Sequence, residues 1–334
     1  MQPRRRPFQN KTIMSKTYTI IRPATHDEWL KQRTLGIGSS EVGTILGVNP
    51  YETPYQLWRR KLGIDPPVPE NPFMRWGHYM EEGVAKCFEL ETGHTVIKAS
   101  AGDWLAVDKQ RDYLRVSPDR TYWLGQSRAN DAKGIVECKS TRMKVDKDNI
   151  PPHWFAQLMY QLGVMNYREG YLAWVNRETL NFGTMQVAFD KDLYSAMVDC
   201  LEKFWTENLV GGKEPDIVTI DDVMLKYPRS NAGKTVEITD EVMDAITEIK
   251  TTKPLIKELE SKVKEAEDTV KTFMADAEVL CLPGTKESNP QIVATWKTGK
   301  DKEKFDTKSF KADHADLCSQ YTSTVPGSRT FLVK

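Results

Sequence analysis

The sequence predicts an α/β fold in which helices flank a central mixed sheet, followed by a C-terminal coiled-coil helical extension and a small β element. Residues 17–225 alternate groups of helix-like and strand-like segments, whereas apolar residues beyond 226 recur at steps of three and four. A length of 334 residues corresponds to about two domains. We therefore expect a basic tail at 1–16, a core at 17–225 and an accessory region at 226–334.

A short strand and two helices open the core. The segment TYTII at 17–21 is β-branched and aromatic, which indicates a strand. Thr25 is placed to cap the first helix, with Glu28 three residues on completing a capping box. Ser39 or Ser40 is placed to cap the second helix.

The remaining helices and strands of the core are predicted from hydrophobic periodicity and from Gly and Pro residues that end or interrupt each element. Thr53 caps a third helix whose first turn carries Pro54, and Gly93 ends a fourth, strongly amphipathic one. The segments expected are helices at 53–63, 74–93, 150–166 and 192–210, strands at 95–98, 112–117, 121–124 and 134–139, and a hairpin within 170–189.

The accessory region carries a coiled-coil pattern. Residues 239–280 are predicted as long helix, in which Pro254 must either start a new helix or kink a continuous one. The tail 283–334 is expected to contain β structure, with SRTFLVK (328–334) pairing with QIVATWK (291–297). The residues of the predicted seam are Ile256, Leu259, Val263, Ala266, Val270, Phe273, Ala277 and Leu280.

Composition excludes several classes of protein. Charged residues make up 28% and hydrophobic residues 39%, an ordinary globular balance. No run approaches the roughly 20 apolar residues of a membrane helix, so we expect no membrane partner. No apolar stretch follows the basic tail, so we expect no secretory signal, and the tail is either disordered or a weak phosphate-binding arm.

The counts of cysteine, histidine and charged residues limit the kinds of metal site and nucleic-acid surface that the chain can carry. No cysteine pair has CxxC spacing, which argues against a zinc ribbon or an iron–sulfur cluster and favours reduced thiols in a cytoplasm. The five histidines are scattered, which argues against a His-based metal site. With 47 basic and 47 acidic residues, a nucleic-acid partner must be bound by a local basic surface.

The segment GIVECKST, 134–141, carries opposite charges on one strand. Alternation places Ile135, Glu137 and Lys139 on one face, and Val136 and Cys138 on the other. A surface strand with a solvent-facing Glu and Lys is the ordinary interpretation of such a triplet. An active site requires further acidic or polar residues nearby.

Asp119 supplies a second acid, just after a strand-like run. If strands 112–119 and 134–139 are neighbours, the carboxylates of Asp119 and Glu137 converge at their ends. Two carboxylates and a backbone carbonyl form an oxygen site suited to Mg²⁺. Lys139 could then orient or deprotonate the attacking water, or neutralise charge on phosphate oxygens, in hydrolysis of a phosphodiester.

Two helices carry further polar candidates. Glu81 and Glu82 lie mid-helix, where paired acids repel, so one carboxylate could point toward the metal; a solvated helix face is the alternative. Gln157 and Gln161 are one turn apart on an otherwise apolar helix. Buried amides need partners, and a lysine or a metal-bound water would serve, as would an ordinary satisfied core.

These segments, in this order, resemble the PD-(D/E)xK nuclease superfamily, and more narrowly the YqaJ-type viral recombinases, the group that includes the phage lambda exonuclease. The resemblance covers about 30–210, and six motifs in register make it specific. The matching segments are RTLGIGSSEVGTILG (33–47), TPYQLWRRKLG (53–63), WGHYMEEG (76–83), SPDR (117–120), ECK (137–139) and HWFAQLMYQL (153–162).

The resemblance assigns roles to individual positions. It implies that Asp119 and Glu137 are metal ligands together with the main-chain carbonyl of Cys138, and that Glu81 occupies the family's helix-acid position. It implies that Lys139 is the catalytic lysine. Further implied roles are support of the active-site network by Gln157 and binding of a DNA 5′-phosphate by Arg33 and Ser40, residue types that suit an anion site.

One position departs from the family. Arg120 follows the motif Asp119, where glycine is frequent, and either adds a phosphate contact or changes the turn. This leaves the implied ligands unchanged.

The resemblance implies an Mg²⁺-dependent exonuclease core, in which Mn²⁺ also serves, within 17–225. Such an enzyme digests linear double-stranded DNA in the 5′→3′ direction and leaves a 3′ single strand for an annealing protein of phage-type recombination. It also implies a homotrimer in the cytoplasm of a bacterial cell or phage-infected host. The alternatives are an endonuclease of the same fold, from restriction or repair, and a non-catalytic DNA-end or partner-binding module. Residues 226–334 could oligomerise, clamp DNA, dock a partner or simply stabilise the core.

Overall fold

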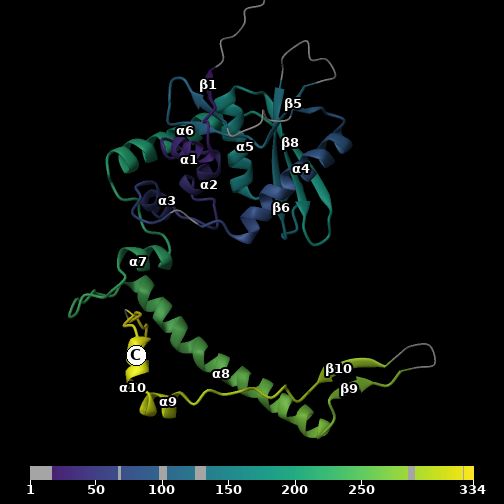
Figure 1. The fold of residues 1–334 in the computed structure, drawn as a ribbon, viewed down its shortest axis with the longest axis vertical. Helices are drawn as coiled ribbons and strands as arrows, with labels where there is room; N and C mark the ends of the chain where they lie inside the picture. Colours follow the sequence, from purple (N-terminus) through teal and green to yellow (C-terminus); the bar gives the residue numbers. More distant parts are fainter. Residues whose placement is uncertain (1–16, 67–68, 98–103, 125–132, 285–289, 326) are drawn as a thin grey trace, which may run out of the picture. The chain divides into compact units, whose positions relative to one another are not determined.

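The computed structural model describes residues 17–66, 69–97, 104–124, 133–284, 290–325 and 327–334 (Figure 1). The predicted tail at 1–16 lies outside the described residues. The chain divides into two compact units, Met1–Lys226 and Tyr227–Lys334, here called unit 1 and unit 2. Each unit is described by itself.

A five-stranded sheet in the order β2-β5-β6-β7-β8 forms the centre of unit 1. Neighbouring strands are antiparallel except β6 and β7, which are parallel and connected through the helix α5. The predicted α/β class with a central mixed sheet is therefore confirmed. The strands are β2 (Val96–Ile97), β5 (Arg120–Trp123), β6 (Lys133–Thr141), β7 (Glu169–Asn176) and β8 (Phe182–Ala188).

A smaller antiparallel sheet lies beside it, in the order β1-β3-β4. Its strands are β1 (Tyr18–Ile21), β3 (Leu105–Asp108) and β4 (Arg115–Val116). β3 was not anticipated, and the strand predicted at 112–117 shrinks to the two residues of β4. β3 pairs with β1, which is distant in sequence, and β4 pairs with β3 over only two residues.

Helices of unit 1 begin and end largely where local capping chemistry places them. Thr25 caps α1 and Thr53 caps α3, each accepting a bond from a backbone N–H of the first turn. Gly93 ends α4 in the left-handed region, where glycine has no Cβ to clash. The helices are α1 (His26–Thr34), α2 (Ser39–Ile45), α3 (Pro54–Lys61), α4 (Pro72–Thr92), α5 (Pro152–Met165), α6 (Lys191–Lys203) with a π-helical continuation at Phe204–Val210, and α7 (Ile220–Lys226).

The cap of α2 was predicted wrongly. Ser39 is already helical, and the N-cap is Gly38, whose N–H donates to the Glu41 side chain at 2.8 Å. The capping-box acid was present in the sequence, but a residue with no side chain occupies the cap.

Helices cover both faces of the central sheet. Val84 and Phe88 of α4 pack in one apolar cluster with Val136 and Cys138 of β6. Ile135 belongs to the larger cluster on the opposite face, which includes much of α5. The alternation predicted for 135–139 is therefore confirmed, and the face that carries Glu137 looks toward α5.

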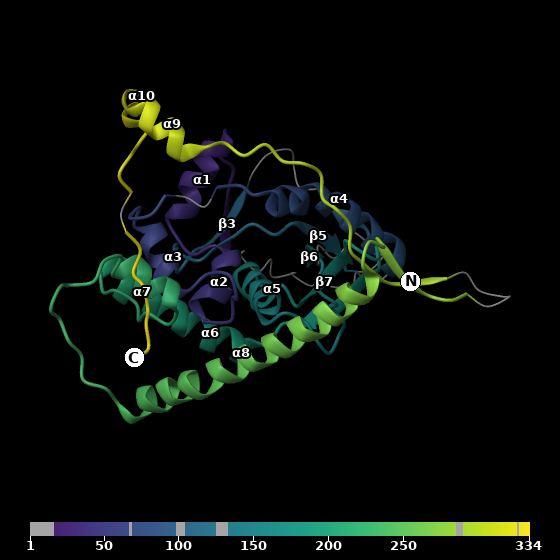
Figure 2. The ribbon, with the colours of Figure 1, turned by 90° about the horizontal axis from the view of Figure 1, so that it is seen from below.

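α2 and α5 lie side by side (Figures 1 and 2). A Cβ added to Gly43 would meet the Cβ of His153 at 2.6 Å, so glycine permits this close approach. The contact brings the turn before α2 and the polar face of α5 into one region.

Unit 2 contains a long helix, α8 (Asp240–Met274), with Pro254 inside it, so the proline does not start a new helix. The helix ends at Met274, and residues 279–282, predicted as helical, form a strand instead. The pairing predicted between 291–297 and 328–334 is wrong, because β10 pairs with β9. The remaining elements are β9 (Val279–Leu282), β10 (Gln291–Thr295), α9 (Thr307–Asp313) and α10 (Ala315–Gln320).

Across the described parts of both units, no helix combines the length and the apolar content needed to cross a membrane.

Candidate active site

Asp119 is brought opposite Glu137 by the register of β5 on β6. Arg120 pairs with Val136 in an antiparallel ladder, so the residue before Arg120 falls beside the residue after Val136. The Asp119 Oδ2 accepts a hydrogen bond from the backbone N–H of Cys138 at 2.8 Å. The predicted convergence of the two acids is present, but its predicted cause is wrong: β4 belongs to the other sheet, and β5 is the neighbour of β6.

Glu137 is a buried carboxylate held by three donors. Its residue is 1% exposed. Its Oε1 accepts from Lys139 Nζ at 2.8 Å and from Gln157 Nε2 at 2.5 Å. Its Oε2 accepts from Gln161 Nε2 at 2.8 Å. Lys139 comes from the same strand and both glutamines come from α5, so this network requires α5 to pack on the sheet.

Lys139 is held as an ammonium group. Besides Glu137 it donates to Gln157 Oε1 at 2.9 Å, so Gln157 bridges the acid and the lysine. Burial alone would lower the pKa of Lys139, but the carboxylates of Glu137 and Asp119 outweigh burial and the pKa is raised. The side chain remains protonated at neutral pH and can stabilise negative charge, whereas it is a poor general base.

Asp119 experiences the opposite balance. Burial, followed by the charges of Glu137 and Glu81, raises the pKa of its carboxyl well above the ordinary value, against the opposing effects of Lys139 and the Cys138 N–H. Carboxylates that repel one another in a buried place are stabilised by an added cation.

Glu81 lies on α4 near this pair. Its Oε1 is 3.1 Å from His78 Nδ1, and its Oε2 is 3.8 Å from Arg120 Nη1. Arg120 also donates to the carbonyl of Asp119 at 2.7 Å. Arg120 therefore connects the acid of α4 to the turn before β5, and the metal-ligand role of Glu81 stays a prediction.

The thiol of Cys138 points into the α4 cluster rather than toward Glu137. Burial, with the negative charge of Asp119, raises its pKa well above the ordinary value, so it stays protonated. A protonated thiol is not a metal ligand. The backbone carbonyl therefore remains the one predicted donor of this residue.

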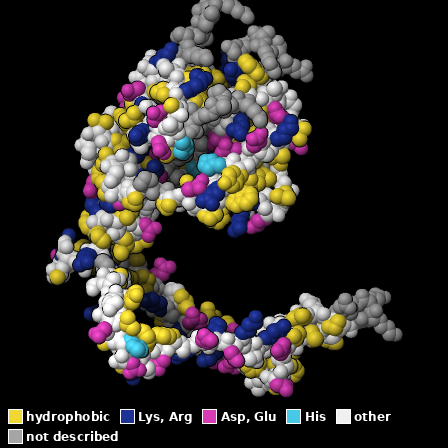
Figure 3. Space-filling view, in the orientation of Figure 1, with side chains coloured by type: hydrophobic (Ala, Val, Ile, Leu, Met, Phe, Trp, Pro, Cys, Tyr) yellow, Lys and Arg dark blue, Asp and Glu magenta, His cyan; other side chains and the backbone are white. Residues whose placement is uncertain are grey.

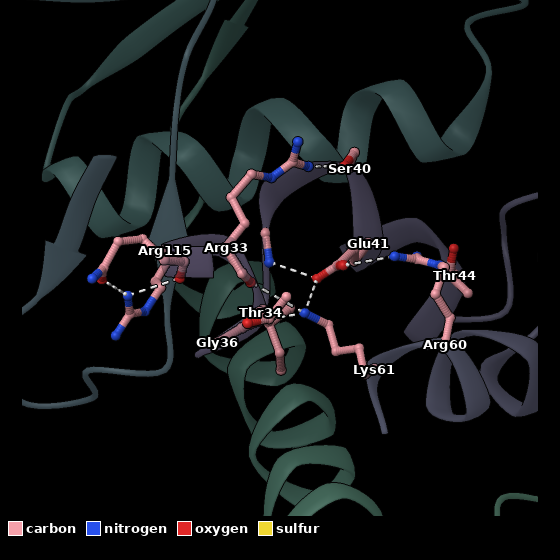
Figure 4. A network of polar contacts seen from close by, with 12 residues as sticks. Arg33, Thr34, Gly36, Ser40, Glu41, Thr44, Arg60, Lys61 and Arg115 are labelled. Carbon is pink, nitrogen blue, oxygen red and sulfur yellow. Dashed lines mark hydrogen bonds and ion pairs between the residues drawn. The ribbon is translucent and has the colours of Figure 1, made fainter. Parts of the chain in front are cut away.

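Arg33 and Ser40 meet at the turn between α1 and α2. Arg33 Nη2 donates to Ser40 Oγ at 3.3 Å (Figure 4). The Arg33 guanidinium lies 4.7 Å from the centroid of the Trp29 ring. Ser40 is exposed at the surface. The structure therefore places the two predicted phosphate-binding residues together.

A buried ion pair supports this turn. Glu41, which caps the turn through Gly38, also pairs with Lys61 Nζ at 2.8 Å. The same ammonium donates to the carbonyl of Gly36 (Figure 4). Lys61 and Glu41 were not singled out from the sequence, since their partners lie about 20 residues away.

His153 was also not predicted from the sequence as a site residue. His153, Gln157 and Gln161 stand at successive four-residue steps of α5, and this spacing was a signal available in the sequence. Burial, and then the charge of Lys139, lowers the pKa of His153.

The residues present suit a hard divalent cation in part. Asp119 and Glu137 supply carboxylate oxygens whose mutual repulsion a cation would relieve. Among the described residues, no group of three or more His, Cys, Asp or Glu side chains is arranged to hold a metal. Two carboxylates and a backbone carbonyl are nevertheless a donor set that Mg²⁺ accepts, because it keeps several waters.

Comparison with known proteins finds a family match within part of the chain. Residues 28–168 match the family described as the YqaJ-like viral recombinase domain. The uncharacterized protein YqaJ of Bacillus subtilis (strain 168) is 28% identical over 305 residues, covering 88% of this chain and 89% of that protein.

Two solved structures are more distantly similar. An alkaline exonuclease (LHK-Exo) from Laribacter hongkongensis is 16% identical, covering 60% of this chain and 96% of that one, with a TM-score of 0.41. A phage related exonuclease from Haemophilus somnus 129PT is 10% identical, covering 53% and 96%, with a TM-score of 0.37. Both likenesses are too distant to add to the fold or to the site. The family match rests on the sequence, and the matched range contains all eight predicted site residues; residues 28–168 are thus similar to the YqaJ-like viral recombinase domain.

Proposed function

We propose that this protein is an Mg²⁺-dependent exonuclease with a PD-(D/E)xK core, which digests linear double-stranded DNA from 5′ ends. The product would be a 3′ single strand for an annealing protein of phage-type recombination. One observation carries the proposal: Asp119 and Glu137 converge beside a protonated Lys139, and Gln157 bridges the last two.

Each residue has a distinct task in this reaction. The carboxylates of Asp119 and Glu137, with the carbonyl of Cys138, would hold Mg²⁺. The bound ion would supply Lewis acidity and a water of lowered pKa. Lys139, held in its charged form, neutralises charge that develops on the phosphate oxygens. Gln157 orients Lys139 and Glu137 relative to each other.

Preference for a DNA end would come from the α1–α2 turn. The guanidinium of Arg33 and the hydroxyl of Ser40 offer donors suited to a 5′-phosphate. Net charge is zero, and on the face shown in Figure 3 Lys and Arg side chains of unit 1 are scattered among acidic and apolar ones. Affinity for DNA therefore has to come from local contacts such as this pair. A homotrimer and an annealing partner are further proposals that rest on the family resemblance.

The experiment that tests the function compares three DNA substrates with and without Mg²⁺. They are linear duplex with 5′-phosphate ends, the same duplex with 5′-hydroxyl ends, and a closed circle. We expect digestion of the phosphorylated duplex in Mg²⁺ or Mn²⁺, slower digestion of the hydroxyl form, no cutting of the circle, and no activity in EDTA. Cutting of the circle would indicate the endonuclease instead. Absence of any cleavage would favour the non-catalytic module.

Substitution of Asp119 links the activity to the site. Asp119→Ala is expected to lower the cleavage rate on the order of 100-fold or more, because it removes a metal ligand. Binding of phosphorylated duplex in Ca²⁺, measured by fluorescence anisotropy, should change little. A variant that digests linear DNA at the wild-type rate would show that the reaction occurs elsewhere.

A further inference from the structure

The long helix of unit 2 carries a regular seam in which nine of ten positions are apolar, Thr252 being the exception. We call this set of positions the α8 seam and label them by the heptad letters a and d. The a positions are Val242, Ile249, Ile256, Val263 and Val270, and the d positions are Ala245, Thr252, Leu259, Ala266 and Phe273. Five consecutive heptads therefore carry a β-branched apolar residue at every a position.

The α8 seam is exposed although it is apolar. Leu259 and Val263 are each 60% exposed and Phe273 is 78% exposed, and Figure 3 shows apolar side chains along the surface of unit 2. Met274 is the only buried residue of α8, all of which is described. Helices draw most of their stability from packing of an apolar face, and contiguous exposed apolar surfaces mark interaction sites. The α8 seam therefore needs a partner.

Part of the seam is already concave. Val263, Ala266 and Val270 of the seam line an open groove of about 510 Å³, together with Met274 beside the seam and with Ala294 and Trp296 of the following segment. A second, shallower hollow of about 350 Å³ is lined by Ile256, Leu259 and Val263, among others. Such hollows between a and d side chains are where the knobs of a partner helix insert.

The residues at the a positions favour a coiled coil of two helices. β-Branched residues at a, with Leu rather than Ile at d, favour two helices in parallel. Leu259 holds the central d position, and no d position carries Ile. The strict seven-residue period also predicts a left-handed supercoil, the geometry of such pairs.

Charges beside the seam fit a second copy of the same helix. In a parallel pair, each g position faces the e position five residues later on the partner. Glu248 would then face Lys253, and Lys262 would face Glu267. None of the five g–e pairs places two like charges opposite each other. Lys262 now pairs with Glu258 within the helix at 2.6 Å, but exposed pairs exchange at little cost.

The proline inside α8 is compatible with this arrangement. Pro254 stands at position f, on the side of the helix away from the seam. Its missing N–H and the bend that it favours therefore leave the a and d side chains free to pack.

We propose that the α8 seam pairs with the α8 seam of a second copy of this chain as a parallel, two-stranded coiled coil. The parallel orientation puts the N-terminal ends of both helices together, so two copies of unit 1 are joined at the same end. The pairing is independent of the nuclease proposed above and of any assembly formed by unit 1.

The mass of the full-length protein tests the pairing. Light scattering after size exclusion, at several concentrations, would compare wild type with Val263→Asp and with Ser261→Asp. Val263 is at position a, whereas Ser261 is at position f, so the second variant adds the same charge to the same stretch of helix without entering the seam. Val263 is exposed on unit 2, so we expect the substitution to leave the folding of α8 intact, which the far-UV circular dichroism of the full-length variant would check.

We expect Val263→Asp to halve the mass and to raise the dissociation constant on the order of 100-fold, because two carboxylates would be buried unpaired. Ser261→Asp should keep the wild-type mass. Equal masses in all three proteins would overturn the proposal, and a threefold drop in Val263→Asp would overturn its two-stranded form.

Orientation is tested by exchanging one charge pair. Glu248→Lys sets Lys against Lys253 of the second copy in a parallel pair, and adding Lys253→Glu restores attraction. Residues 248 and 253 are five apart, so they are not neighbours on one helix. Weakening by the first change and recovery with the second would support the parallel pair. If the double variant associates no better than Glu248→Lys, the parallel orientation is wrong.

Discussion

Removing the ammonium of Lys139 should destabilise unit 1 when no metal is present. The Lys139→Met side chain keeps most of the aliphatic length but leaves Glu137, 1% exposed, without the cation that pairs with it among the described residues. Loss of one member of a buried ion pair costs about 3–5 kcal/mol. The Lys139 side chain is 20% exposed, and two glutamine amides still donate to Glu137, so we expect the lower end, about 3 kcal/mol.

Thermal unfolding followed by tryptophan fluorescence measures this loss. Eight of the nine tryptophans lie in unit 1, so the signal reports mainly the unit that contains the site. For a unit of 150–250 residues, roughly 2–4 °C is lost per kcal/mol, so the midpoint in EDTA should fall by about 6–12 °C. Lys144→Met, at an exposed lysine, is the matched control and should shift the midpoint by about 1 °C or less.

Adding Mg²⁺ distinguishes the role of Lys139 as counter-ion of Glu137 from its role in catalysis. If Asp119 and Glu137 hold the ion, Mg²⁺ should recover more stability in Lys139→Met than in wild type, because it replaces a missing positive charge. Cleavage should stay lost. A melting midpoint of Lys139→Met in EDTA within about 1 °C of wild type would refute the reasoning, since Glu137 would then not depend on the ammonium.

Four further predictions concern Gln161, His153 and Arg33. Gln161→Leu should lower the free energy of unfolding, measured in urea, by about 1–2 kcal/mol, because Glu137 Oε2 loses its donor. The loss is partly offset because the substitution also removes Gln161 Oε1, which is buried and has no partner among the described residues. Because the pKa of His153 is lowered in the folded protein, the unfolded chain binds a proton first as pH falls below about 6.5. The stability of the wild type should therefore decline from that pH down to the lowered pKa. The stability of His153→Gln should decline less over the same range. In Lys139→Met, NMR titration should show the pKa of His153 closer to its ordinary value. Arg33→Ala should raise KM for 5′-phosphorylated duplex with little effect on 5′-hydroxyl duplex, and equal effects on both would remove Arg33 from the phosphate site.

Local chemistry made parts of this protein predictable. The caps at Thr25, Thr53 and Gly93 depend on a few neighbouring residues, so the sequence alone set these helix ends. Alternation along β6 set which face carries Glu137 and Lys139, because successive strand residues point to opposite sides. The heptad period set the α8 seam in the same way.

Contacts between distant segments decided the rest. The register of β5 on β6 placed Asp119 opposite Glu137, and pairing of β9 with β10 turned the predicted end of the long helix into a strand. The three donors around Glu137 and the bond between Lys61 and Glu41 exist because separate elements pack together. Spacing in the sequence determines what faces one strand or one helix presents, whereas the partner of each face depends on burial and on hydrogen bonds between elements far apart in the chain.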